Sequence, residues 1–157
     1  MREVHYSGPW GAVEIADYLK KTFVPMKLAA VSESGWPVLV SLWFYFESGC
    51  LICASRSHSR IISLLSKDCR CAFEVSGDTP PYSGVRGQGD VSLYNDPTGR
   101  ILGRLHDRFL GAENTQFRRW LLDGADKEVI IFIKPVRLMS WDYTSRMSVS
   151  TTDNMAQ

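Results

Sequence analysis

The sequence lacks a long apolar run and a strong net charge, and we expect no secretory leader. None of its apolar stretches approaches the roughly 20 residues that a membrane-spanning helix needs. Its 18 basic and 17 acidic side chains leave a formal net charge of +1, which gives no electrostatic reason to expect nucleic acid or a membrane surface as a partner. The first residues carry no apolar segment typical of a signal peptide. We therefore expect a cytoplasmic protein without nucleic-acid or membrane partners.

Cysteine is scarce, and its four copies form two short pairs, Cys50 with Cys53 and Cys69 with Cys71. Disulfides are not expected without a secretory signal. A zinc site would require both pairs to converge on one point. Cys50 and Cys53 lie in an expected strand, where residues three apart face opposite sides of the sheet. We therefore expect buried or half-buried reduced thiols and no metal site.

Motifs for hydrolysis and nucleotide chemistry are also missing. The sequence has no paired-carboxylate pattern, nucleophile elbow or phosphate loop. Three arginines, Arg100, Arg104 and Arg108, recur every four residues beside an apolar arc, which is typical of a solvated basic stripe on a helix. We interpret His106, within that stripe, as a surface histidine. The residues therefore assign no catalytic acid or base.

Apolar periodicity and turn residues divide the rest of the chain into about seven strands and four helices. The expected strands are Met26–Ser32, Pro37–Phe46, Cys50–Ser55, Cys69–Ser76, Gly84–Leu93, Glu128–Lys134 and Arg137–Tyr143. The expected helices are one from Ser7 to before Pro25, with Ser7 as N-cap, then His58–Ser66, one opened by Asp96-Pro97, and one capped by Asn114. This order favours a mainly antiparallel β-barrel with peripheral helices over a doubly wound sheet.

The strand expected at Pro37–Phe46 is apolar on both faces, with aromatic side chains on each. One wall of a barrel needs only one apolar face, so the second face must be covered. A helix of the same chain, a partner subunit and a flat ligand are the three alternatives. The segment Val129–Phe132 has the same double apolar character and indicates another buried contact.

The six residues from Ser55 to Arg60 join an expected strand to an expected helix. They bring together hydroxyl groups, an imidazole and two guanidinium groups. Free backbone N–H groups at a helix start favour an anion, and arginine adds charge and paired donors. Taken alone, the segment is either a phosphate site or an ordinary helix cap.

The order of these motifs resembles that of the pyridoxamine 5′-phosphate oxidase-like FMN-binding split barrels. The resemblance rests on Gly35-x-Pro37, Leu42-Trp43-Phe44, Ala54 to Arg60, Tyr82 to Gly89 and Pro135 to Asp142. It covers roughly residues 10 to 145. It does not extend to pyridoxamine phosphate oxidase itself, because the Trp-Gln-Gly segment of that enzyme is missing. The fold implied is an antiparallel split β-barrel with peripheral helices, Greek-key-like and of the α+β class, over residues 1–145, with a polar, frayed tail at 146–157.

The resemblance also implies a cofactor, a set of contacts and an assembly. FMN would lie between two subunits of a homodimer, and the protein would be a flavin-dependent oxidoreductase acting on a small-molecule substrate or electron donor. The second strand would border the flavin ring, the strand-to-helix segment would hold the phosphate, and a later strand and the partner's C-terminal region would add contacts. The cofactor-binding residues so implied are Val40, Ser41, Leu42, Trp43, Ser55, Ser59, Arg60, Arg86, Gln88 and Trp141, with Arg146 as a further partner contact.

Two alternatives remain open at this stage. The same architecture also binds a deazaflavin or haem in relatives, and Arg56 or Arg86 could serve the acidic tail of a deazaflavin. The imidazole ligands available to haem are His5, His58 and His106. The third class is a non-enzymatic flavin-binding module, which the sequence does not distinguish from an enzyme, because the cofactor itself carries the redox chemistry.

Overall fold

The computed structural model describes residues 3–152 of the chain. Their strands are β1 (His5–Ser7), β2 (Met26–Val31), β3 (Pro37–Leu42), β4 (Phe44–Glu47), β5 (Cys50–Arg56), β6 (Arg70–Ser76), β7 (Ser83–Asn95) and β8 (Glu128–Asp142). Their helices are α1 (Ala12–Lys21), α2 (Arg60–Lys67), α3 (Arg100–Leu110), α4 (Thr115–Asp123) and α5 (Thr144–Thr152), with one 3₁₀ turn at Ala125–Lys127. None of these helices is long and apolar enough to cross a membrane.

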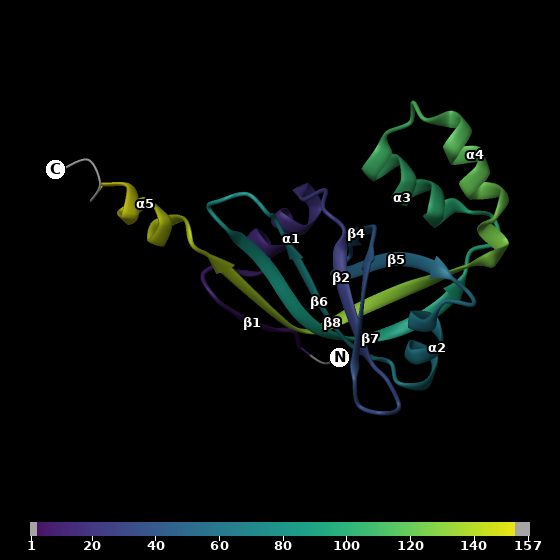
Figure 1. The fold of residues 1–157 in the computed structure, drawn as a ribbon, viewed down its shortest axis with the longest axis horizontal. Helices are drawn as coiled ribbons and strands as arrows, with labels where there is room; N and C mark the ends of the chain where they lie inside the picture. The colour runs from purple at the N-terminus through teal and green to yellow at the C-terminus, as the bar shows by residue number, and fades with distance from the viewer. Residues whose placement is uncertain (1–2, 153–157) are drawn as a thin grey trace.

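The strands form one curled sheet in the order β3-β2-β6-β7-β8-β5-β4, and β1 adds to β8 in parallel. The pairs along this order are antiparallel. The long strands β7 and β8 run through the middle of the molecule and bend along their length (Figure 1). Within residues 3–152 the sheet does not close, although β3 comes near β5. The architecture is therefore an antiparallel split barrel with peripheral helices, as expected from the sequence.

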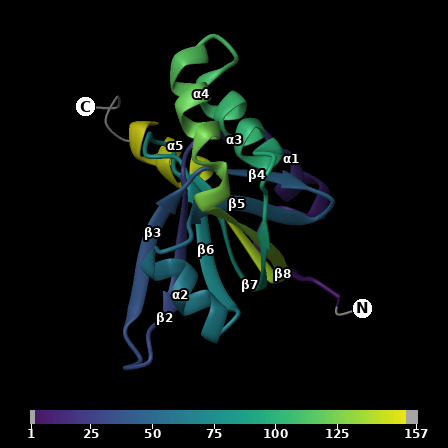
Figure 2. The same cartoon turned by 90° about the vertical axis from the view of Figure 1, so that its right-hand side faces the viewer.

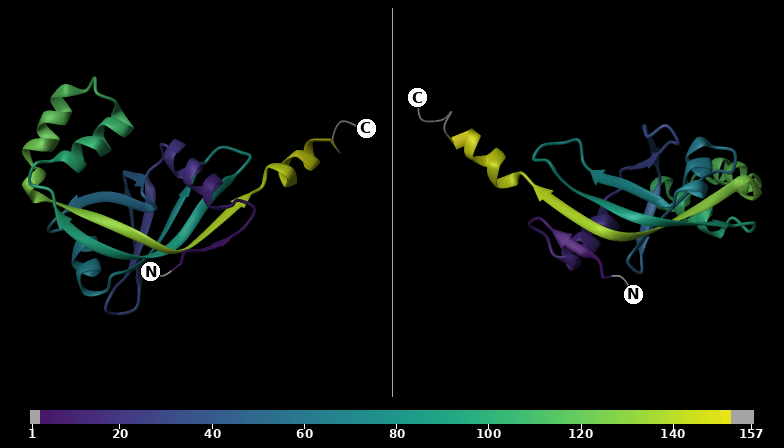
Figure 3. Two further views of the ribbon diagram at one scale, coloured as in Figure 1. Left: turned by 180° about the vertical axis from the view of Figure 1, so that it is seen from behind. Right: turned by 90° about the horizontal axis from the view of Figure 1, so that it is seen from below.

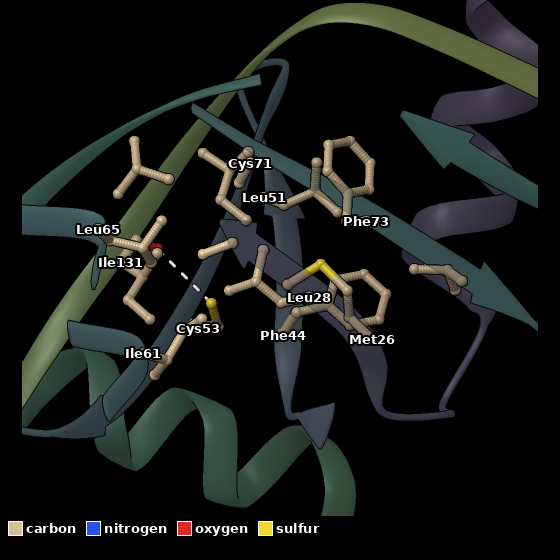
Figure 4. Close-up of a cluster of buried hydrophobic side chains, with 14 of the residues drawn as sticks. Met26, Leu28, Phe44, Leu51, Cys53, Ile61, Leu65, Cys71, Phe73 and Ile131 are labelled. Atoms are coloured by element: carbon tan, nitrogen blue, oxygen red, sulfur yellow. Dashed lines mark hydrogen bonds between the residues drawn. The ribbon is translucent and has the colours of Figure 1, made fainter. Parts of the chain in front are cut away.

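The inner face of the barrel holds the main hydrophobic core. Strand β2 shows why: its side chains alternate between buried and exposed, so Met26, Leu28 and Ala30 point inward. Figure 4 shows how Leu28 and Phe44 pack with Leu51 and Phe73 from other strands. Helix α2 adds four buried aliphatic side chains to this core and packs against β2 and β5, as the view of Figure 2 helps to follow.

Two strand boundaries differ from the sequence-based expectation. The strand expected at Pro37–Phe46 is interrupted at Trp43, so that β3 pairs with β2 whereas β4 pairs with β5. The two last expected strands are one strand, β8, which passes through Pro135. The pairing of β7 with β8 shifts between Gln88 and Gly89, and Pro135 lies opposite Gly89. A bulge tolerates proline because no ladder hydrogen bond from its nitrogen is needed there.

Two helix starts also differ. Ser7 ends strand β1 and is not the N-cap of α1, because Gly11 has that role and its N–H donates to Glu14 Oε2 at 2.7 Å. Helix α3 begins at Arg100, after a turn. The Asp96 carboxylate nevertheless caps it, accepting from the N–H of Ile101 at 2.7 Å. Asn114 caps α4 as expected, since its Oδ1 accepts from the N–H of Phe117.

The remaining helices lie at opposite ends of the barrel. Helices α3 and α4 form a hairpin at one end, and α5 extends from the other end of β8 (Figures 1 and 3). Residues 144–152 are helical, which corrects the expectation of a frayed tail as far as Thr152. Residues 153–157 of the expected tail lie outside the described residues.

Candidate functional site

The junction between β5 and α2 carries the hydroxyl groups predicted to hold a phosphate. Ser55 Oγ donates to Ser59 Oγ at 3.0 Å, and the Ser59 N–H donates to the Arg56 carbonyl at 2.9 Å. Ser59 is the N-cap residue of α2, yet in the described structure its side chain makes no capping hydrogen bond. The first-turn N–H groups of α2 are therefore left without the usual hydroxyl acceptor. Such uncapped amides favour an anion.

The two arginines of this junction have different surroundings. Arg56 Nε lies 2.9 Å from Glu128 Oε1, so its charge is already paired. Burial raises the pKa of Glu128, and the nearby Arg56 and His58 oppose that rise. Arg60 is exposed at the first residue of α2, and among the described residues no carboxylate forms an ion pair with it. Arg60 is therefore the cation at this helix start that is available to a ligand.

The four residues predicted on the second strand point in three directions. Val40 and Leu42 are half-buried and pack against the barrel core. Ser41 is exposed on the outer face, where its Oγ accepts from Lys27 Nζ at 3.0 Å. Trp43 stacks on Phe109 of α3, with ring centroids 5.4 Å apart and planes 9° apart. Of the four side chains, Ser41 faces solvent most directly.

Strand register explains which outer-face residues meet. Cross-strand partners share a face, so two adjoining rows of side chains run across the sheet. The first row is Ser41, Lys27, Glu74, Arg86 and Met139. The second row is Leu39, Ala29, Ala72, Gln88 and Arg137.

The small alanines in the second row leave a hollow of about 380 Å³ between longer side chains. Lys27, Arg86 and Arg137 line it, with Glu74 as its carboxylate. A second hollow of about 550 Å³ adjoins it, because both are lined by Ala29, Ala72 and Gln88. We call the first of these the outer-face groove. Its volume lies within the range of roughly 300–1,000 Å³ found for small-molecule sites.

Trp141 and Arg86 form a stack at one side of the outer-face groove. The Arg86 guanidinium lies 4.5 Å from the centre of the Trp141 ring. Trp141 in turn lies directly over Gly84, its partner across the strands, where a Cβ would come within 2.6 Å of the indole ring. Gly84 thus makes room for the indole, and the indole supports the guanidinium.

Seven of the ten predicted cofactor-binding residues fall into two groups, and Val40, Leu42 and Trp43 belong to neither. Ser55, Ser59 and Arg60 lie together at the start of α2, whereas Ser41, Arg86, Gln88 and Trp141 lie on the outer face of the sheet. Lys27 and Arg137 belong to the second group and were missed by sequence reasoning. Each alternates with buried residues along its strand, which is a signal of outward orientation, but the register that joins them to Arg86 is not readable from one strand alone.

The cysteine expectation is correct for three of the four residues. All four are free; Cys53 and Cys71 are buried, Cys50 is half-buried, and Cys69 is exposed. Burial raises the pKa of all three covered thiols, that of Cys71 to about 12. Cys69 corrects the expectation because its side chain points away from the core at the residue before β6.

The basic stripe predicted on α3 is solvated at two of its three arginines. Arg104 forms a two-point ion pair with Glu47, and Arg108 donates three hydrogen bonds to carbonyl oxygens in and after the last turn of α1. Arg100 and Arg104 are exposed, as expected, whereas Arg108 is half-buried. His106 is fully buried rather than on the surface, next to Phe117 of α4. These side chains hold α3 in place and do not form a ligand site with the groove.

Comparisons with known proteins place this geometry in a wider context. No protein-family model and no curated protein matches the sequence. Solved structures do match. A conserved hypothetical protein of Mycobacterium tuberculosis, Rv2991, is 24% identical with a TM-score of 0.74, and 86% of each chain is covered. An F420 reductase is 22% identical with a TM-score of 0.69, over 83% of this chain and 97% of that one.

A third match has lower identity. A putative pyridoxamine 5′-phosphate oxidase from Listeria innocua is 16% identical with a TM-score of 0.57, over 80% of this chain and 91% of that one. Identities below 25% establish the common architecture and leave the ligand open. The chain has the split-barrel fold of the pyridoxamine 5′-phosphate oxidase-like proteins.

Proposed function

We propose that the protein binds a flavin-type cofactor, FMN in the first instance, with its phosphate at the start of α2. The observation that carries this proposal is the uncapped helix start, where Ser59 turns its hydroxyl to Ser55 and Arg60 has no carboxylate partner in the described chain. A phosphate there would accept from the first-turn N–H groups and from Arg60. The flavin ring would then border β3 near Ser41.

A bound flavin supplies hydride or electron transfer, so the residues of the chain have the tasks of binding and orientation. We therefore propose an oxidoreductase acting on a small molecule. Helix α3 covers part of the apolar second face predicted on Pro37–Phe46, because Trp43 and Tyr45 pack under it. Leu39, further along the same face, remains 66% exposed.

The exposed end of the β2–β3 hairpin supports a homodimer. Val31 and Trp36 are 52% and 74% exposed, and Val31 shares the outer face with Leu39. Apolar side chains gathered on one face are typical of an interface. We propose that a second copy of the chain covers this face and encloses the cofactor.

A deazaflavin is the second candidate, and the match with an F420 reductase favours it. The start of α2 would hold the phosphate of the deazaflavin as well. Both cofactors would therefore contact Arg60, and they would differ in the contacts of their ring and tail. Haem has less support, because His106 is fully buried. This leaves His5 and His58 as the imidazoles that could ligate haem.

Substitution of Arg60 tests the phosphate site. Arg60→Gln removes a charge-assisted contact worth about 1.5–3 kcal/mol, so the Kd for FMN should rise roughly tenfold to hundredfold in equilibrium dialysis. Riboflavin, which lacks the phosphate, should bind the variant and the unaltered protein alike. This difference separates loss of a phosphate contact from damage to the fold.

Lys67→Gln is the matched control, because it removes one positive charge from the other end of the same helix, where Lys67 pairs with Glu33. Its affinity for FMN should stay within about twofold of the unaltered protein. Absence of FMN binding to the unaltered protein would refute the proposal. If Arg60→Gln weakened the binding of FMN and of riboflavin equally, the proposed phosphate site at the start of α2 would be wrong.

A further inference from the structure

The outer-face groove contains two arginines whose charges are not neutralised. No carboxylate of residues 3–152 forms an ion pair with Arg86 or Arg137. Arg70, which lines the adjoining hollow, instead makes several contacts with Asp68, including Nη2–Oδ2 at 2.7 Å. Glu74, the carboxylate of the groove, accepts from Ser76 Oγ at 2.9 Å. The groove therefore has unpaired positive charge at the β7–β8 side.

The two guanidinium groups are placed to act on one ligand. Arg86 lies opposite Met139, and Arg137 lies opposite Gln88, so the two arginines are diagonal neighbours on adjacent strands. Diagonal neighbours stand roughly 7–8 Å apart, within reach of long side chains toward a common point. Gln88 adjoins both arginines, since it lies directly opposite Arg137 and two residues after Arg86 on β7, and it adds an amide donor. Two guanidiniums with an amide match the two oxygens of a carboxylate.

The surrounding surface fits a flat apolar body. Leu39, Ala29, Ala72 and Met139 line the groove beside the arginines. The Trp141 indole packs against one face of the Arg86 guanidinium. The N–H groups of Arg86 are therefore oriented by this packing and not by a counter-ion. Preorganised donors of this kind lose less conformational entropy when a ligand binds.

Distance along the sheet separates these arginines from the proposed flavin ring. Ser41 and Arg86 are three strands apart in the same row, which is about 14 Å at about 4.8 Å per strand. An anionic group bound at Arg86 therefore belongs either to a second ligand or to the far end of a long one. In either case the apolar body of that ligand would extend toward Ser41.

We propose that the outer-face groove binds a small organic anion with a flat apolar body, whose carboxylate is held by Arg86, Arg137 and Gln88. This site deepens the proposed function, since such an anion would be the substrate that lies beside the cofactor. Binding of the anion itself needs no flavin. In this proposal Arg86 and Gln88, which the family resemblance assigned to the cofactor, contact its substrate.

Calorimetric titration with 2-naphthoate tests the site, with the uncharged 2-naphthamide as the matched ligand. We expect 2-naphthoate to bind the unaltered protein at least tenfold more tightly than 2-naphthamide, with and without FMN. Arg86→Gln and Arg137→Gln should each weaken naphthoate binding fivefold or more and leave naphthamide unchanged. Arg70→Gln, which removes an arginine already paired with Asp68, should leave both ligands within twofold.

Substitutions at Gly84 and Trp141 test whether these residues position Arg86. Gly84→Ala should displace the indole and weaken naphthoate selectively, whereas Trp141→Phe, which retains an aromatic face, should weaken it less than Trp141→Leu. Equal binding of the acid and the amide, or no binding of either, would overturn the proposal. FMN binding without naphthoate binding refutes this site alone, and naphthoate binding without FMN binding refutes only the proposed cofactor.

Discussion

At the scale of the residue, burial decides the chemical character of side chains that look alike in the sequence. Cys69 and Cys71 are two positions apart, yet Cys69 is exposed and Cys71 buried. The strand expected at Cys69–Ser76 places both thiols on one face, which is correct for Cys71; Cys69 differs because β6 begins only at Arg70. His106 shows the opposite error, because its place in a run of charged residues suggested a surface position. The neighbouring helix α4 buries it, and no local pattern contains that contact.

Thiol labelling tests these assignments. At pH 8, a disulfide-exchange reagent should modify Cys69 first and Cys50 more slowly, because burial covers Cys50 in part and raises its pKa. Cys53 and Cys71 should react only when the protein unfolds, since their raised pKa values leave little thiolate at that pH. A Cys69→Ser variant should lack the fast phase. Rapid reaction of three or four thiols in the folded protein would contradict the described burial.

At the scale of the element, the sequence identified most helices and strands but not their breaks. Apolar periodicity located α2 and the central strands, and the Asn114 cap located α4, because each signal depends on residues close in sequence. The interruption at Trp43 and the bulge at Pro135 depend on other elements. Trp43 leaves the strand to stack on α3, and Pro135 is accommodated by a register shift against β7. The apolar periodicity of one segment does not indicate that α3 packs on Trp43 or that β7 lies opposite Pro135.

The Asp96 carboxylate provides a test at this scale. It accepts from two N–H groups of the first turn of α3 and is 8% exposed, so Asp96→Ala should lower the free energy of unfolding by about 1–2 kcal/mol. Urea unfolding followed by circular dichroism measures this change. Asp78→Ala, in the exposed loop before β7, should change it by less than about 0.5 kcal/mol. Similar losses in both variants would mean that Asp96 does not cap α3.

At the scale of the whole molecule, register and curvature bring together residues that the sequence keeps apart. The resemblance of motif order was sufficient to predict the split barrel. It also implied a phosphate site at Ser55, Ser59 and Arg60, and the structure brings these three residues together at one helix start. It did not reveal Lys27 and Arg137, because their meeting with Arg86 depends on pairing across four strands, β2, β6, β7 and β8. The groove is thus a property of the assembled sheet.

The central claim is that this split barrel binds a flavin-type cofactor in a site completed by a second copy of the chain. Native mass spectrometry of the protein equilibrated with FMN tests both parts in one measurement. Two chains of 17.7 kDa each should appear together with up to two FMN molecules, and the flavin should remain bound when the dimer is selected. A monomer without bound flavin, at concentrations where the protein is folded, would contradict the account.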